Sequence, residues 1–256
     1  MPRIYFTVTT DLSYDQRMIR ICTSLARSGY DVILVGRKLP DSKPLLKQPF
    51  RQKRIRCFFD KGKLFYAEYN IRLFIYLLFK KMDGICAIDL DTILPCFYIS
   101  SIKKIKRIYD AHELFCEMKE IVTRPGIYKF WKKTEQKTVP HFPLGYTVNQ
   151  PIADEFFNMY GVKYEVIRSI ALYNESLQQH NREKFILYQG AVNEGRCFEQ
   201  LIPAMQQVNA ALIICGDGNF MQQAKQLVRT YSLENKVIFK GMIEPSELKK
   251  ITSKAY

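Results

Sequence analysis

Short runs of β-forming residues alternate with amphipathic helical segments along the chain, and this alternation restricts the fold more than any other feature. A first run over residues 3–9 precedes residues 14–28, where apolar side chains recur at the i, i+3, i+4 spacing of a helix. Gly29 ends that helix, and an apolar run over 31–36 follows. A strand, a helix and a second strand in so short a stretch predict a βαβ unit and a parallel sheet.

The same alternation continues to about residue 172. It predicts one doubly wound α/β domain over residues 1–172. Further helices are predicted over 70–81, 94–103, 113–135 and 150–160, and further strands over 84–88, 106–110, 145–148 and 164–168.

A second domain is predicted after a polar linker over residues 173–183. Strands over 185–189, 211–215 and 236–240 alternate there with helices over 195–208, 220–231 and 246–253. At roughly 150 residues per domain, a chain of 256 residues holds fewer than two domains. We therefore predict that the second parallel-sheet domain, 184–256, is incomplete and leaves apolar sheet edges exposed.

Composition excludes several other classes. The chain is 47% hydrophobic, which argues against disorder, and no apolar run reaches the ~18 residues of a membrane-spanning helix. The N-terminus lacks the pattern of a signal peptide, so we expect a cytoplasmic protein. Seven cysteines without a CxxC pair indicate reduced core thiols instead of disulfides or a zinc site.

Positive charge is concentrated in residues 43–81. This segment carries a net charge of +9 out of +14 for the chain, together with nine of the 34 aromatic residues. Such a segment fits an anionic membrane surface at the inner face, or the backbone of a nucleic acid. The third interpretation is a core helix over 71–79 that ends at Lys80 and Lys81. Because no nucleic-acid-binding motif accompanies the charge, we expect no nucleic-acid partner.

Ligands of parallel sheets bind at the carboxyl ends of the strands, so the loops there are the candidate sites. The loop after the first strand contains no glycine, which excludes a dinucleotide site. In the second domain, Gly190 and Gly195 are five residues apart and precede Arg196 and a helix. Arg196 and Cys197 replace the Lys and hydroxyl residue of a nucleotide triphosphatase loop, so an anion site is what remains. The alternative is a plain glycine turn with a solvated arginine.

Two other loops carry polar or flexible residues. Gly216 and Gly218 lack the third glycine of a dinucleotide fingerprint, and we interpret them as allowing a ligand to approach the backbone. His112, beside Asp110 and Glu113 at a strand end, can bond a sugar hydroxyl or move a proton. The alternative is that Asp110 caps a helix and His112 is incidental.

A pair of aspartates follows another predicted strand. Asp89 and Asp91 are interpreted as N-capping and turn residues, because no further ligand lies at a suitable spacing. The sequence therefore predicts no metal site.

Six segments in order resemble the retaining glycosyltransferases of family 4, and together they cover essentially the whole chain. The resemblance implies two Rossmann-like domains of the GT-B type. Departures include Ala191 and Cys197, where the family often has Arg and Gly, and the family's paired glutamates lie beyond Tyr256. The segments are DLSYDQRMIRICTSLARSGYDVILVGR, YDAHELF, TVNQPIADEFFNMYG, LYQGAVNEGRCFEQLIPAM, IICGDG and VIFKGMIEPSEL.

The resemblance also implies roles for individual residues. His112 would contact the donor sugar as the catalytic residue, and Arg196 would hold the donor diphosphate. Backbone at Gly190, Gly195, Gly216, Gly218 and Met242 would contact the rest of the donor, and Asp15, Arg17 and Glu113 would border the acceptor side.

The implied reaction moves a sugar from a nucleotide diphosphate sugar to a glycan or lipid-linked acceptor, with retention at the anomeric carbon and without a cofactor or metal. A non-catalytic sugar or nucleotide binder and a sugar-nucleotide epimerase of the same fold are the alternatives. Without the distal glutamates, we expect this chain to be a fragment that transfers sugar poorly or not at all.

Overall fold

The computed structural model describes residues 1–170 and 183–255. The chain divides into two compact units, Met1–Ile170 (unit 1) and Ala171–Tyr256 (unit 2). Of the predicted linker, residues 173–182 lie outside the described residues and only Glu183 lies within them.

Unit 1 contains a seven-stranded sheet in which neighbouring strands run parallel. The strand order is β3-β2-β1-β4-β5-β6-β7, so the chain builds outward from β1 and then returns to add β4 on its other side. Such a reversal leaves a crevice between the loops that follow the two central strands. The strands are β1 (Arg3–Asp11), β2 (Asp31–Lys38), β3 (Arg51–Arg56), β4 (Gly84–Ile88), β5 (Lys106–Asp110), β6 (Leu144–Thr147) and β7 (Glu165–Val166).

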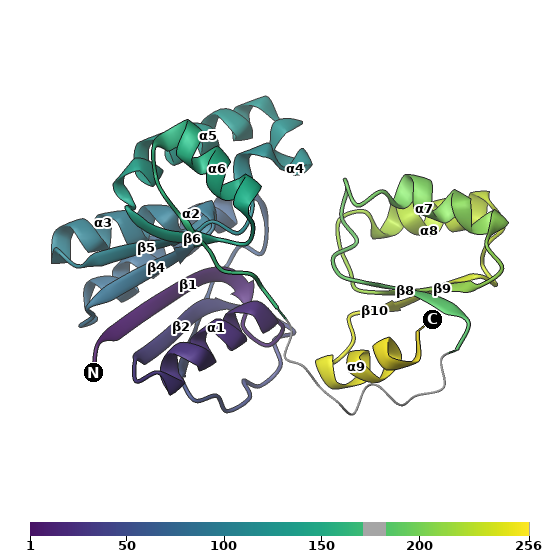
Figure 1. The fold of residues 1–256 in the computed structure, drawn as a ribbon, viewed down its shortest axis with the longest axis horizontal. Coiled ribbons are helices and arrows are strands. Elements are labelled where there is room, and N and C mark those ends of the chain that lie inside the picture. Colours follow the sequence, from purple (N-terminus) through teal and green to yellow (C-terminus); the bar gives the residue numbers. More distant parts are fainter. Residues whose placement is uncertain (171–182, 256) are drawn as a thin grey trace. The chain divides into compact units, whose positions relative to one another are not determined.

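Helices cover both faces of this sheet (Figure 1). They are α1 (Gln16–Arg27), α2 (Gly62–Leu78), α3 (Ile93–Lys103), α4 (Lys119–Val122), α5 (Pro125–Thr138) and α6 (Gln150–Tyr160), with short 3₁₀ turns η1 (Leu90–Thr92), η2 (Phe115–Glu117) and η3 (Val139–His141). Because successive strand residues point to opposite faces, the central strands contribute to two cores. Phe6 and Cys86 pack in the core that contains α1, whereas Tyr5 and Ile85 pack in the core of α2, α3, α5 and α6.

The structure differs from the sequence-based elements where the sequence is basic or interrupted by proline. β3 was not predicted, because Ile55 is its one buried residue; as an edge strand it pairs only with β2. α2 begins eight residues before the predicted start, since Phe65 and Tyr69 already belong to its buried face. The predicted helix over 113–135 is divided, because Pro125 lacks a backbone N–H and starts α5 as its first residue.

Unit 2 contains a three-stranded parallel sheet in the order β10-β9-β8. Its strands are β8 (Phe185–Gln189), β9 (Ala211–Cys215) and β10 (Val237–Gly241), and its helices are α7 (Phe198–Ala204), α8 (Met221–Thr230) and α9 (Pro245–Lys254), with a 3₁₀ turn η5 (Met205–Gln207). α7 and α8 lie on one face and α9 on the other (Figure 1). Ile186 of β8 and Ile238 of β10, the two outer strands of this sheet, are 39% and 41% exposed.

All seven cysteines lie among the described residues and are free thiols. The prediction of core thiols is confirmed for Cys22, Cys86, Cys96, Cys116 and Cys215, which are buried; Cys57 is half-buried and Cys197 is exposed.

Candidate functional site

A cavity of about 470 Å³ lies in unit 1 at the carboxyl ends of β1 and β4, where the strand order reverses. Ligands of open α/β sheets bind at such a switch point, and a few convergent polar groups give them orientation. The polar residues that line the cavity are Thr9, Thr10, Asp11, Tyr14, Asp15, Gln16, Arg17, Asp89, Asp91 and His112.

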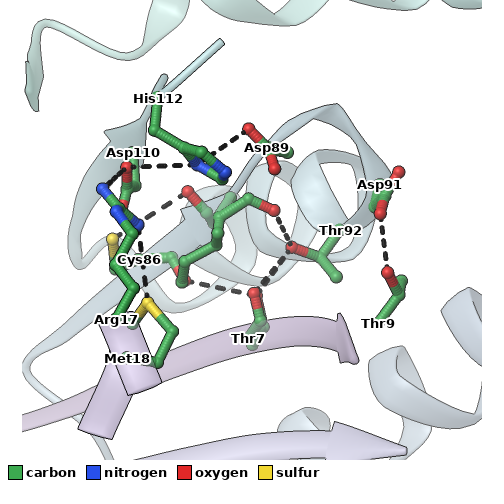
Figure 2. Close-up of polar contacts among 12 residues, drawn as sticks. Thr7, Thr9, Arg17, Met18, Cys86, Asp89, Asp91, Thr92, Asp110 and His112 are labelled. Carbon is green, nitrogen blue, oxygen red and sulfur yellow. Dashed lines mark hydrogen bonds and ion pairs between the residues drawn. The ribbon is translucent and has the colours of Figure 1, made fainter. Parts of the chain in front are cut away.

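A bidentate ion pair joins Arg17 of α1 to Asp110 at the end of β5 (Figure 2). Both terminal nitrogens of the guanidinium, Nη1 and Nη2, donate to the carboxylate at 2.6 Å, and the Asp110 side chain is fully buried. Burial alone would raise the pKa of Asp110, but contacts with His112 and Arg17 lower it below its ordinary value. The alternative that Asp110 caps a helix is therefore wrong. Arg17, a predicted acceptor-side residue, already uses its guanidinium to bind Asp110.

His112 lies between two carboxylates at the rim of the same cavity. Its Nδ1 atom is 3.1 Å from Asp89 Oδ1 and 3.7 Å from Asp110 Oδ1 (Figure 2). The side chain is 29% exposed, so a ligand can reach the imidazole. Asp89 has φ +53°, a conformation that costs a residue with a side chain about 1–3 kcal/mol and that occurs most often at functional sites.

Asp89 and Asp91 both have raised pKa values. Burial, together with the charges of Glu113, Asp91 and Asp110, raises the pKa of Asp89 well above its ordinary value. Burial raises the pKa of Asp91 to about 6, although the Thr9 hydroxyl donates to Asp91 Oδ2 at 2.6 Å. Among the described residues, no partner bonds to the other oxygen of Asp91, which is buried.

Asp89 and Asp91 lie in the turn that follows β4, as predicted, but neither side chain forms an N-cap bond. Asp89 occupies the N-cap position of η1 without a side-chain cap bond, and Asp91 bonds across to β1 through Thr9. The hydroxyls of Thr7 and Thr92, 2.9 Å apart, hold η1 against β1 beneath them (Figure 2). Both carboxylates therefore belong to the cavity.

The remaining predicted acceptor-side residues have different environments. Asp15 caps α1, because its side chain accepts from the Met18 N–H at 3.0 Å, and it also accepts from the Thr10 hydroxyl at 2.8 Å. Glu113 is half-buried. Ligand atoms of Asp89, His112 and Glu113 lie within 4.8 Å of one another, so these residues have the chemistry to hold a cation, whereas the sequence predicts no metal.

In unit 2, the loops at the carboxyl ends of the strands interlock. The Gly216 N–H donates to the carbonyl of Gly241 at 2.8 Å. Gly216 has φ +146°, and a Cβ atom there would lie 1.8 Å from the carbonyl oxygen of Gly190. A Cβ atom on Gly218 would lie 2.4 Å from the carbonyl oxygen of Val192. The predicted donor-side glycines Gly190, Gly216 and Gly218 are thus brought together, and close backbone packing requires two of them.

The segment that follows Gly190 presents Gly195, Arg196 and Cys197 at the surface. Gly195 has φ +82° and Cys197 has φ +58°, so this cysteine holds a left-handed conformation that glycine favours. α7 begins after Cys197 and has seven residues, shorter than the predicted helix. Among the described residues, no group forms an ion pair with the Arg196 side chain. Met242, the residue after β10, is 57% exposed.

Sequence reasoning missed the contacts that cross between strands. Asp11 of β1 pairs with Arg54 of β3 at 2.6 Å and also bonds Ser42, and both ionic side chains are nearly buried. The sequence did contain a signal that Asp89 and Asp91 belong to a site, because both follow a fully apolar strand. Their approach to His112 depends on the pairing of β4 with β5.

Comparison with known families gives one match. The family model described as Glycosyl transferases group 1 matches residues 170–256. A search of curated proteins gives no significant match.

Solved structures match over the full length of the chain. Sucrose-phosphate synthase from Thermosynechococcus elongatus matches with a TM-score of 0.72 at 15% identity, and the chain covers 74% of it. Anabaena HepE in complex with UDP and glucose matches with a TM-score of 0.67 at 14% identity and 72% coverage. UDP-N-acetylglucosamine 2-epimerase from Rickettsia bellii matches with a TM-score of 0.66 at 11% identity and 72% coverage.

At these identities the solved structures show the fold. The predicted fold class is confirmed: a seven-stranded parallel sheet and a second, small parallel sheet match the GT-B architecture of glycosyltransferase structures.

Proposed function

We propose that this protein is a glycosyltransferase that moves a sugar from a nucleotide diphosphate sugar to a glycan or lipid-linked acceptor, with retention of the anomeric configuration. The observation that carries the proposal is the family match over residues 170–256, which includes the interlocked loops of Gly190, Gly216 and Gly218. The fold supports it, and HepE, which has this fold, was solved with UDP and glucose.

On the donor side, Arg196 would neutralise the diphosphate. When the bond at the anomeric carbon breaks, negative charge develops on the leaving diphosphate, and a guanidinium can bind two of its oxygens at once. Arg196 is exposed beside the loop of Gly190 and Gly195, and its charge is not consumed by a carboxylate among the described residues. These properties fit the role that the sequence assigned to it.

On the unit 1 side, the cavity would hold the sugars. His112 is accessible and would contact a hydroxyl of the donor sugar. The Asp91 side chain borders the cavity and would accept a hydrogen bond from an acceptor hydroxyl, which increases the nucleophilicity of the hydroxyl oxygen. Arg17 would act indirectly, because its guanidinium is bound to Asp110.

A second candidate is a sugar-nucleotide epimerase. The R. bellii epimerase has the same fold at nearly the same TM-score as HepE. A binder without catalytic activity is the third candidate.

Product analysis distinguishes the three. The chain is incubated with nucleotide sugars labelled in the sugar and with saccharide or lipid-linked acceptors, and products are separated and identified by NMR. We expect slow transfer of the label into a new glycoside whose anomeric configuration equals that of the donor. An epimerised nucleotide sugar, a glycoside of inverted configuration, or a bound donor that stays unchanged over a long incubation would contradict the proposal.

Substitution of Arg196 tests the donor site separately from turnover. We expect Arg196→Ala to weaken UDP binding by roughly 10- to 100-fold in calorimetry, the loss of a charge-assisted hydrogen bond. Arg229→Ala removes an exposed arginine in the last turn of α8 and should leave the affinity unchanged. Equal UDP affinities of the Arg196→Ala variant and the parent protein would show that the phosphate assignment is wrong.

Asp91 gives a pH dependence that is measurable without an acceptor. Its pKa of about 6 in the folded state exceeds the ordinary value of 3.8, so the folded state binds this proton more tightly than the unfolded state. The resulting stabilisation is complete below the unfolded pKa and is lost as the pH rises through 6. Asp91→Asn cannot ionise. Its free energy of unfolding should therefore rise relative to the parent protein by roughly 2–3 kcal/mol between about pH 4 and pH 7.

Urea unfolding at several pH values measures this difference. Asp41→Asn, at an exposed position after β2, is the control and should change stability by less than about 0.5 kcal/mol. A pH-independent difference for Asp91→Asn would mean that this carboxyl does not titrate near pH 6.

A further inference from the structure

α2 is apolar on two opposite faces. Its inner face, Phe65, Tyr69, Leu73 and Leu77, is buried against the sheet. Its outer face carries Leu64, Ile71 and Ile75, which are 60%, 61% and 52% exposed, and Phe79 at its C-cap is 78% exposed. A helix of a globular domain ordinarily has a polar outer face. The core packing of unit 1 therefore does not explain Leu64, Ile71 and Ile75 of α2.

The exposed residues form one stripe. Positions 64, 71, 75 and 79 are spaced by seven and four residues, which places them on the same side of a helix. Phe58, 85% exposed, precedes α2 in the chain but lies beside the middle of the helix, because its N–H bonds Glu68 and its ring lies 5.0 Å from the guanidinium of Arg72. We call Phe58, Leu64, Ile71, Ile75 and Phe79 the outer face of α2. Several exposed apolar side chains on one side of a helix are typical of an interaction site.

Cations flank the outer face at both ends. Lys61 and Lys63 lie at the N-terminus of α2, and Lys80 and Lys81 follow its C-terminus. The charge of Glu68 is paired with Arg72 at 2.7 Å. An apolar stripe bordered by lysines is complementary to a lipid bilayer, which is apolar inside and, where its lipids are anionic, negatively charged at its surface.

A second cavity borders α2 on a different side from the outer face, and the flanking lysines, not this cavity, favour lipid over a protein partner as the occupant. Its volume is about 550 Å³, and it lies between the N-terminal half of α2 and α5. Tyr66, Phe115 and Trp131 give it an apolar lining, and Lys63 and Arg124 also border it. Lys63 is thus shared between the cavity and the cationic margin of the outer face, whereas Leu64, Ile71 and Ile75 do not border the cavity.

We propose that the outer face of α2 docks this protein onto an anionic lipid bilayer, with the helix lying in the plane of the interface. Among the residues that the structure describes, no helix meets the length and hydropathy of a membrane span. The proposed attachment uses one face of α2 and is independent of the proposed transfer reaction.

Sedimentation with vesicles tests the proposal. The full chain is mixed with phosphatidylcholine vesicles that contain or lack phosphatidylglycerol. We expect binding only to the anionic vesicles. Ile71→Ser with Ile75→Ser should reduce it roughly tenfold, and Lys80→Glu with Lys81→Glu should abolish its dependence on phosphatidylglycerol. All four positions are at the surface or its margin, and circular dichroism checks that the fold is kept.

Matched pairs in unit 2 serve as controls. Ile186→Ser with Ile238→Ser changes two exposed isoleucines, and Lys249→Glu with Lys250→Glu reverses two adjacent lysines of α9; both variants should bind like the parent protein. The proposal is overturned if the parent protein ignores anionic vesicles or if the Ile71→Ser, Ile75→Ser variant binds equally well. It is also overturned if light scattering shows a dimer that this variant converts to a monomer, because the face would then join two copies.

Discussion

The ion pair between Arg17 and Asp110 is the interaction on which the unit 1 site depends. A carboxylate that is fully buried at the end of β5 would be costly without a partner, because a low-dielectric interior disfavours an isolated charge. Arg17 supplies that partner through two hydrogen bonds of 2.6 Å and so ties the start of α1 to β5. Ala111 and His112 follow directly, so the pair also fixes the backbone that carries the accessible imidazole against Asp89.

The pKa of Asp110 and the pKa values of two nearby carboxyl groups, Asp89 and Asp91, are shifted in opposite directions because their surroundings differ. Asp110 contacts a guanidinium and an imidazole and has a lowered pKa, whereas burial raises the pKa of Asp89 and of Asp91. Carboxyl groups whose pKa values are shifted in opposite directions differ in their tendency to accept hydrogen bonds from hydroxyl groups and to donate hydrogen bonds to them. That combination agrees with a polyhydroxylated ligand and supports the proposed function more specifically than the fold alone does.

The sequence predicted what local patterns determine. The strands over 84–88, 106–110, 185–189 and 211–215 and the helix over 150–160 agree with the structure residue for residue, because apolar runs and caps define them locally. β3 and the first turns of α2 were missed, since an edge strand and a helix with two apolar faces do not show the usual patterns. The proximity of Asp89 to His112 follows from pairing between β4 and β5, which spacing along the chain does not reveal.

A double-mutant cycle on the ion pair tests the account most directly. Arg17→Met and Asp110→Asn are introduced separately and together, and the free energy of unfolding of each variant is measured by urea titration. The account predicts that Arg17→Met alone costs about 3–5 kcal/mol, because it leaves a buried charge without its partner. It also predicts that the double variant is more stable than the sum of the single effects by at least about 2 kcal/mol. Effects that add within about 0.5 kcal/mol would contradict the claim that this pair organises the site.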